Sequence, residues 1–439
     1  MKTACVLCLS LAVPRLAAGQ APAVNVTQDT ASTFHGPFQL LTATATSTPP
    51  PTVAPTATNL PLTGIGLIYL AKSYGSEPPI NPATIAGITN PHMKGMLWRE
   101  TWERLDTNGQ GNHDWTFLDA CFAASDSHDK DAALQILAGN FAPPWFFNLP
   151  NARQITTSGL NLPTTIPWDP VFQTEWEAVQ TAMADRYRSN ARLRYVVIAG
   201  PGHSSESFFA TKPEEFTQAN DLAVSMGYSG CDQAWRAGVT WLIDMYARVW
   251  APIPVVLCTG TPYADTNGGT AALQAMYDYG DSAHRGQFGA RADDLTSGSP
   301  TPSEPSATII RQLSPHSMAV GYQFGNHQNV NDTNPPTRLD QALNRGTGFG
   351  AHYMEVFADD ADAALSAAVL DAANARMLAS LSIARSGTNM VLSWALAGTL
   401  QYTPEVSFTT VWSNLPLATN PYTLTSTNQQ GFYRLNLSP

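Results

Sequence analysis

Residues Val196 to Glu206 read VVIAGPGHSSE and have the pattern of a buried strand that ends in a polar turn. Val196, Val197 and Ile198 are β-branched, and the Gly-Pro pair that follows them stops the strand. Functional groups collect just past the carboxyl ends of parallel strands, so we interpret Glu206 as a carboxylate that meets a ligand. A solvated loop Glu is the alternative, because Glu is seldom buried.

Seven more strand-like segments alternate with helix-like segments between residues 64 and 382. Alternation of this kind indicates an α/β fold with a parallel sheet, and eight strands is the number in a (β/α)8 TIM barrel. A doubly wound sheet is the alternative, although it usually has fewer strands. The expected strands are Gly66–Leu70, Lys94–Trp98, Ala133–Ala138, Arg194–Ala199, Pro254–Thr259, Gly286–Ala290, Met318–Tyr322 and Phe349–Val356.

The segments on either side of the expected barrel differ from it in composition. Residues 1–19 combine Lys2, a short apolar stretch and small residues, which is typical of a secretory signal and predicts a secreted protein. Residues 20–63 form an N-terminal segment and a Thr/Pro/Ala-rich linker that cannot build a core. Residues 386–439 show period-two alternation with Pro and Asn between the runs, so we expect a small C-terminal all-β module there.

Composition narrows the function classes. The formal net charge of −11 argues against a nucleic-acid partner, which needs a basic face. Charged residues make up only 13% of the chain, which suits a neutral polar ligand. Beyond the signal, no apolar run of about 18 residues predicts a membrane span. Cys121, Cys231 and Cys258 remain after the signal; they permit at most one intrachain bridge and are most simply core-filling residues.

Two stretches resemble clan A glycoside hydrolases, a group of TIM-barrel enzymes. GMLWRETWERLDTNGQGNHDWTFLDACFAAS, which begins at Gly95, resembles their second βα unit, and ALQILAGNFAPPWF, which begins at Ala133, resembles their third strand with its Pro-Pro-Trp tail. The resemblance implies sugar contacts at the barrel mouth, by which we mean the carboxyl ends of the barrel strands. Packing inside the fold is the alternative for the three indoles, because Trp is often largely buried. The residues implied are Trp98, Arg99, Trp102, Asn140 and Trp145.

The stretch Ala199 to Glu206 resembles the GxxGxxGE motif of family 42 β-galactosidases and related bacterial glycosidases. Here Ala stands for the first Gly and Ser for the third. The resemblance implies that Glu206 is the general acid/base. We also expect His203, three residues before it, to line the cleft. A carboxyl enclosed beside aromatic walls has a raised pKa and can deliver a proton near neutrality.

Glycoside hydrolysis needs a second carboxylate. HYMEVFADD, which begins at His352, resembles a late strand of such barrels and implies that Glu355 is the nucleophile of a retaining mechanism. Our count places Glu355 on the eighth strand, whereas clan A enzymes carry the nucleophile on the seventh, where this chain has Gln323. Either the count is wrong by one strand and Glu355 serves, or the pair is incomplete and the protein binds without cutting, because an amide cannot be the nucleophile.

Other polar residues complete the predicted site. The stretch Arg291 to Asp294 resembles a polar segment that ends the sixth strand of these relatives. The resemblance implies that Arg291 holds a carboxylate in place and that Asp293 or Asp294 binds sugar hydroxyls; a structural salt bridge is the alternative. His352 and Gln323 are further expected sugar contacts. The histidines have no metal-ligand spacing, so we expect neither a metal nor a cofactor.

The sequence therefore predicts a secreted glycoside hydrolase that cleaves O-glycosidic bonds of a poly- or oligosaccharide through Glu206 and Glu355. A carbohydrate-binding barrel without catalysis is one alternative. The other is a surface-attached structural protein, since the C-terminal tail resembles a β-module of secreted bacterial proteins. The sugar, the linkage and the oligomeric state stay open.

Overall fold

A computed structural model describes most of the expected barrel and several C-terminal strands. The described residues are 9–10, 64–70, 80–157, 161–204, 206–328, 337–378, 381–386, 389–394, 399–403, 413–415, 422–424 and 432–436. The chain divides into two compact units, and the larger consists of Leu62–Ser382 with Trp394–Ala397. The predicted linker and most of the predicted signal lie outside the described residues.

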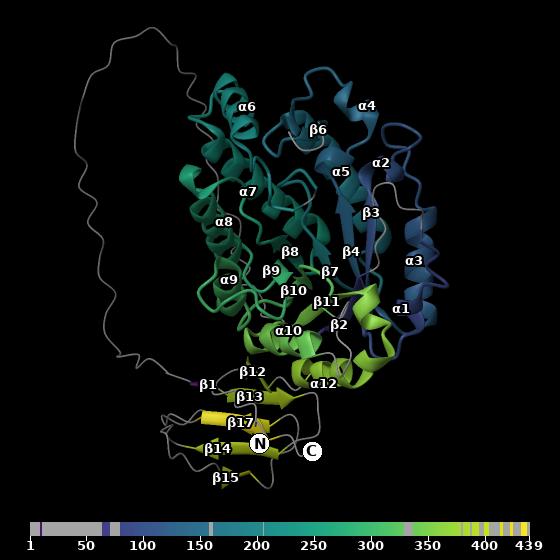
Figure 1. Cartoon of the computed structure of the whole chain (residues 1–439), viewed down its shortest axis with the longest axis vertical. Helices are drawn as coiled ribbons and strands as arrows, with labels where there is room; N and C mark the ends of the chain where they lie inside the picture. Colours follow the sequence, from purple (N-terminus) through teal and green to yellow (C-terminus); the bar gives the residue numbers. More distant parts are fainter. Residues whose placement is uncertain are drawn as a thin grey trace, which may run out of the picture. The chain divides into compact units, whose positions relative to one another are not determined.

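Eight parallel strands close into a barrel in the larger unit (Figure 1). Each overlaps one of the strands predicted from sequence, so the (β/α)8 prediction is confirmed and the doubly wound alternative is wrong. Nearly every residue of these strands is buried, as expected where helices cover the outside of a parallel barrel. The barrel strands are β2 (Gly66–Leu70), β3 (Gly95–Thr101), β4 (Asp131–Leu137), β7 (Leu193–Val197), β8 (Val255–Cys258), β9 (Phe288–Leu295), β10 (Val320–Phe324) and β11 (Tyr353–Phe357).

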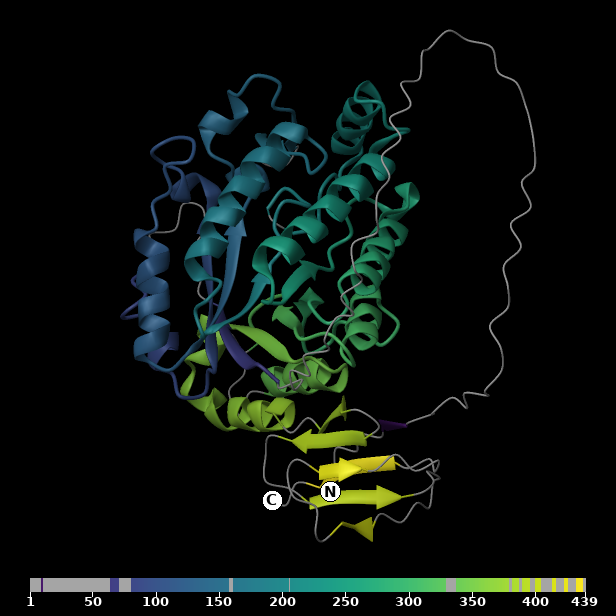
Figure 2. The ribbon, with the colours of Figure 1, turned by 180° about the vertical axis from the view of Figure 1, so that it is seen from behind.

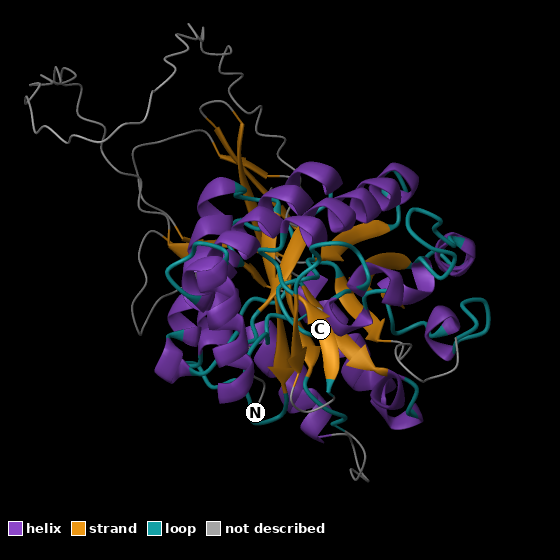
Figure 3. Cartoon of the chain, turned by 90° about the horizontal axis from the view of Figure 1, so that it is seen from above, coloured by secondary structure: helices purple, strands orange, loops and turns teal. Residues whose placement is uncertain are grey.

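Helices flank the strands, as the views from behind and from above show (Figures 2 and 3). The longer ones are α3 (Thr116–Ser127), α5 (Pro170–Tyr187), α6 (Pro213–Ser225), α7 (Cys231–Trp250), α8 (Gly269–Ala283), α9 (Pro305–Leu313), α10 (Thr337–Gly348) and α12 (Ala367–Leu378). The short ones are α1 (Ala86–Thr89), α2 (Trp102–Leu105), α4 (Pro144–Phe147), α11 (Ala358–Ala361) and the 3-10 turns η1 (Gly139–Phe141), η2 (Asp265–Asn267) and η3 (Ala364–Ser366).

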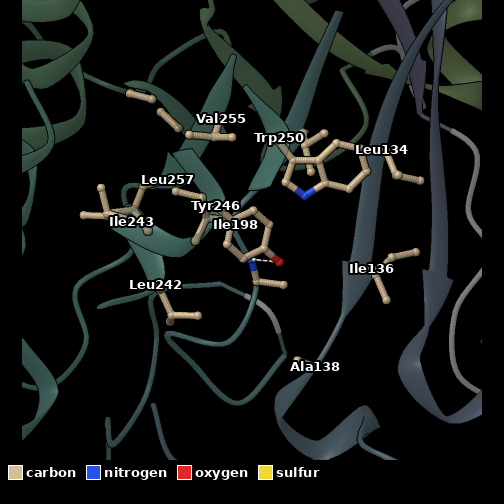
Figure 4. Close-up of a cluster of buried hydrophobic side chains, with 14 of the residues drawn as sticks. Leu134, Ile136, Ala138, Ile198, Leu242, Ile243, Tyr246, Trp250, Val255 and Leu257 are labelled. Carbon is tan, nitrogen blue, oxygen red and sulfur yellow. Dashed lines mark hydrogen bonds between the residues drawn. The ribbon is translucent and has the colours of Figure 1, made fainter. Parts of the chain in front are cut away.

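Helix α7 shows how this outer layer is held. Its buried side chains Leu242, Ile243 and Tyr246 lie against the outward residues of β7 and β8 (Figure 4). Each fully buried side chain of this size stabilises the fold by about 1.5–3 kcal/mol. The backbone N–H of Ala199 donates to the Tyr246 hydroxyl at 3.1 Å, which fixes the segment just past β7. The carboxyl end of the fourth barrel strand is therefore anchored to a packed helix.

The connections after the third and fourth barrel strands carry extra elements. A hairpin of β5 (Gln154–Thr157) and β6 (Leu162–Thr165) precedes α5, and α6 precedes α7. The backbone N–H of Thr156 in the hairpin donates to Gln218 Oε1 of α6 at 3.1 Å. This hydrogen bond joins the connection after the third barrel strand to the connection after the fourth (Figure 1). We had not predicted the hairpin as a separate element.

The C-terminal strands form small antiparallel sheets, so all-β structure is present where the sequence predicts it. One sheet has the order β1 (Leu9–Ser10), β17 (Phe432–Asn436), β14 (Thr399–Thr403) and β15 (Ser413–Asn414). The other has the order β12 (Leu381–Ser386), β13 (Asn389–Trp394) and β16 (Tyr422–Leu424). Among the described helices, none has both the length and the apolar character needed to span a membrane.

Candidate active site

The loop that carries Glu206 is folded tightly on itself. A Cβ atom on Gly202 would collide with the carbonyl oxygens of Glu206 and Phe208, so only glycine fits there. The backbone N–H of His203 donates to the Phe208 carbonyl at 3.0 Å and closes the loop. The Glu206 side chain is left 28% exposed at the end of the fourth strand. The predicted place of Glu206 at the mouth is therefore what the fold produces.

Gly202→Ala tests this account of the loop. We expect the substitution to lower the free energy of unfolding by about 1–3 kcal/mol, because the backbone must move to admit a methyl group. Gly298→Ala is the matched control, since nothing lies within 4 Å of a Cβ at that loop position. Urea unfolding of both variants measures the difference, and equal stabilities would contradict the account.

Arg291 is the centre of a charged cluster inside the barrel. It lies on β9, its side chain is fully buried, and its Nη1 donates to Gln135 Oε1 at 3.0 Å. Its Nη2 lies 3.9 Å from Glu206 Oε1, and its Nε lies 3.8 Å from Glu355 Oε2. A buried guanidinium needs nearby acidic or polar partners. The two predicted catalytic carboxylates are thus held by one guanidinium.

Glu355 is enclosed at the centre of the fold. Its side chain has no exposed surface, and the Tyr195 hydroxyl donates to its Oε1 at 2.8 Å. It lies on β11, the eighth barrel strand, and its register partner on β10 is Gln323. The strand count was therefore correct, and the alternative that it is wrong by one strand is excluded. A nucleophile must touch the anomeric carbon, so the burial of Glu355 contradicts its predicted role.

Asp293 lies two residues beyond Arg291 on β9, where the pairing of this strand with β10 is irregular. It is only partly buried. Burial, and then the negative charge of Glu206, raise the pKa of Asp293 to about 6, although the Arg291 and Arg99 guanidiniums oppose the rise. A carboxyl with this pKa holds its proton in mildly acidic solution. Asp293 and Glu206 are therefore two interacting acids at the mouth.

Arg99 and Gln323 form the other polar pair of the inner wall. Arg99 Nη2 donates to Gln323 Oε1 across the barrel, and both side chains are nearly buried. Gln323 lies on β10, the seventh barrel strand, as counted from sequence. Its amide therefore occupies the strand from which clan A enzymes take their nucleophile.

Three further residues predicted to contact sugar are His203 in the Glu206 loop, Asn140, which touches that loop, and Trp145, which follows Asn140 along the chain. The backbone N–H of Asn140 donates to the His203 carbonyl at 2.7 Å, so the loops after the third and fourth strands touch. His203 is partly buried, and burial lowers the pKa of its imidazole. Trp145 follows on α4, partly exposed, with its ring edge-on to Trp102 at 5.9 Å. These three residues remain candidates for substrate contact.

Two predicted indoles are buried and packed inside the fold. Trp98 is buried on the outer face of β3, where its Nε1 donates to Ser125 Oγ on α3 at 3.0 Å. Alternation along the strand turns Trp98 outward and Arg99 inward. Trp102 is also buried, and its Nε1 donates to Asp106 Oδ2 at 2.8 Å. The expectation that they bind sugar is therefore wrong, and the packing alternative holds for both.

His352 lies at the opposite end of the barrel from the mouth. It precedes β11, and its carbonyl accepts from the backbone N–H groups of Ile65 and Gly66 at the start of β2. Its Nε2 lies 3.1 Å from the Ser314 carbonyl, and burial lowers its pKa to about 4. The prediction that His352 contacts substrate is wrong, because the residue stands before its strand and the mouth lies after it.

Two members of the cluster, Gln135 and Tyr195, had not been predicted. Gln135 lies on β4 and Tyr195 on β7, and both side chains are buried. A polar residue at a strand position whose side chain points into the barrel is the sequence signal that could have identified them. Within the described residues, no group of three or more His, Cys, Asp or Glu side chains is placed to hold a metal ion. Cys121, Cys231 and Cys258 are free and buried, as expected of core-filling residues.

An open hollow of about 470 Å³ lies elsewhere, at the amino ends of α8 and α9. None of the predicted site residues lines it. Asp265 in the hollow accepts a hydrogen bond from the backbone N–H of Thr270, in the first turn of α8. This hollow is therefore separate from the predicted site.

Comparisons with known proteins find likeness in backbone structure alone. No protein-family model matches the chain, and no curated protein matches its sequence. The catalytic domain of a β-amylase from Paenibacillus polymyxa is similar over 70% of this chain and 95% of that domain, with 10% identity and a TM-score of 0.46. A β-galactosidase from the psychrophilic Marinomonas ef1 is similar over 70% of this chain and 58% of that protein, with 12% identity and a TM-score of 0.44. These likenesses concern the fold and assign no activity.

Proposed function

We propose that this protein is a secreted glycoside hydrolase that cleaves O-glycosidic bonds of a neutral poly- or oligosaccharide at the barrel mouth. The observation that carries the proposal is the pairing of Glu206 and Asp293. These acids come from the ends of the fourth and sixth strands, both are partly exposed, and the charge of Glu206 helps to raise the pKa of Asp293. Glycoside hydrolases usually act through two carboxyl groups whose environments differ.

The two acids have different roles in the proposed mechanism. Asp293, with a pKa of about 6, protonates the oxygen of the leaving sugar. Glu206 supplies the carboxylate on the other side of the scissile bond, where it attacks the anomeric carbon or activates a water molecule. This assignment revises the sequence-based one, in which Glu206 was the acid and Glu355 the nucleophile. The retaining outcome rested on Glu355, so it is now a question for experiment.

The charges at the mouth favour a neutral sugar. Both guanidiniums of the cluster already contact side chains of the protein, since Arg291 meets Gln135 and Arg99 meets Gln323. An anionic sugar would need a cation that is not already engaged in this way, and it would also meet the negative charge of Glu206. The low content of charged residues, 13% of the chain, agrees with a neutral polar ligand.

A polysaccharide screen tests the proposed function. The purified protein is incubated with a panel of neutral plant and algal polysaccharides at pH 5 to 7, and released reducing ends are measured. We expect release from at least one member of the panel, and proton NMR of the first product then shows whether the anomeric configuration is retained or inverted. If the protein binds none of the glycans and releases no reducing ends, the proposal fails.

A carbohydrate-binding barrel without catalysis is the second candidate. The amide of Gln323 on the seventh strand and the enclosure of Glu355 favour it, because the position and the residue expected to supply a nucleophile are both unsuitable. A glycan array separates the two candidates. Binding at micromolar protein concentration together with no release of reducing ends selects the binding barrel.

A further inference from the structure

We infer that Glu355 is a positioning residue whose buried carboxylate acts through the Arg291 guanidinium on Glu206 and Asp293. The inference deepens the proposed function and rests on it for its kinetic consequences. Its physical content, a charge coupling between Glu355 and Asp293, is independent of whether a sugar is cleaved.

Arg291 links the enclosed acid to the mouth. Three of its nitrogen atoms face three different partners: Nη1 faces Gln135, Nη2 faces Glu206 and Nε faces Glu355. The side chains of Arg291 and Glu355 have no exposed surface, whereas that of Glu206 is 28% exposed. Charges act over longer distances where water is excluded. A change of charge at Glu355 is therefore felt at the mouth.

A purely stabilising ion pair does not account for this arrangement. The Nε to Oε2 separation of 3.8 Å is longer than a hydrogen bond, and the direct hydrogen bond to Glu355 comes from Tyr195. Buried ion pairs seldom stabilise a fold more than apolar residues of similar volume would. What Glu355 supplies is a fixed negative charge that offsets part of the positive charge of Arg291.

The offset sets how strongly the Arg291 guanidinium favours the ionised form of Asp293. Other groups that act electrostatically on Arg291 or Asp293 stay the same when Glu355 is changed. These groups are Arg99 on β3, Tyr195 on β7, Glu206, Cys258 on β8, Tyr277 on α8, Asp294 on β9 and Tyr353 on β11. Without the Glu355 charge, the guanidinium would favour the ionised form of Asp293 more strongly, so its pKa would fall. The mouth would then lose its proton donor near neutrality.

Carbon-13 NMR of the Asp carboxyls measures the coupling directly. The protein is labelled at Asp, and the Asp293 signal is assigned by its absence from Asp293→Asn. We expect the titration midpoint of Asp293 to fall in Glu355→Gln and to return toward the wild-type value in Glu355→Asp, which restores the charge. Glu103→Gln, a change on the exposed side of α2, is the control and leaves the midpoint unchanged. An unchanged or raised midpoint in Glu355→Gln overturns the inference.

A second variant covers the case in which Glu355→Gln does not fold. Glu355→Gln combined with Arg291→Gln removes both members of the buried pair, so Glu206 acts on Asp293 without opposition from Arg291. The double variant is compared with Arg291→Gln alone. Because Glu355 acts through Arg291, the two Asp293 midpoints are expected to agree, and a lower midpoint in the double variant overturns the inference.

The kinetic consequence is separate from the NMR result. Glu355 is out of reach of substrate, so Glu355→Gln is expected to shift the alkaline limb of the kcat/KM profile to lower pH and to change KM little. A fall of the midpoint by one pH unit lowers the rate at pH 7 about tenfold. If the NMR midpoint moves but no glycan is cleaved by the wild type, the proposed function fails and the charge coupling stands.

Discussion

Glu206→Gln is expected to lower the rate of glycan hydrolysis by about 10²–10⁴-fold, the range that a positioned acid or base contributes. The amide keeps the size of the side chain and one acceptor oxygen, but it can act neither as a nucleophile nor as a base. The side chain is 28% exposed, and its contact with Arg291 is long at 3.9 Å. The fold should therefore survive the change, with a free energy of unfolding within about 1 kcal/mol of the wild type.

The matched control for Glu206→Gln is Glu214→Gln. Glu214 is exposed in the first turn of α6, a few residues along the same connection, and it touches none of the cluster residues. Reducing-end release is measured for both variants at several pH values. Full activity in Glu206→Gln would remove Glu206 from the mechanism, and an equal loss in both variants would point to a general effect of the connection.

The barrel could be predicted because each strand has its own local signal. An apolar β-branched run bounded by Gly or Pro, such as Val196–Ile198, identifies a strand without knowledge of its neighbours. The number of such runs then identifies the architecture. The place of Glu206 followed from the same local reading, because the mouth is simply where the strands end.

Short stretches of sequence did not predict the role of a side chain where that role depends on its three-dimensional surroundings. Trp98 and Arg99 are adjacent, and only the period-two alternation of β3 separates the packed indole from the inward guanidinium. Glu355 is near the end of its strand, as predicted, but its enclosure depends on Tyr195, 160 residues away along the chain. The raised pKa of Asp293 depends on Glu206, which belongs to another strand connection. Neither of these facts is contained in a short motif.

Asp293→Asn is expected to lower the hydrolysis of natural glycans by about 10²–10⁴-fold, because the leaving oxygen is then no longer protonated. A dinitrophenyl glycoside of the same sugar has a leaving group that needs no proton. We expect the variant to cleave it within about tenfold of the wild-type rate, and to lose the alkaline limb of the pH profile, which in the wild type follows the pKa of about 6. Comparable losses on both substrates would contradict the role of Asp293 as the acid.

The stability of Asp293→Asn gives an independent check with a definite sign. The pKa of Asp293 is raised from 3.8 to about 6 in the folded protein, so the folded state holds a proton that the unfolded chain releases. Between these two values the folded protein binds more protons than the unfolded chain, and the wild type therefore loses stability as the pH rises. The amide cannot ionise and avoids this loss. The difference in Tm, variant minus wild type, should grow from pH 4 to pH 6 and stay constant above that. A difference independent of pH would mean that Asp293 is not held protonated by its surroundings, and the proposed acid would have to be sought elsewhere.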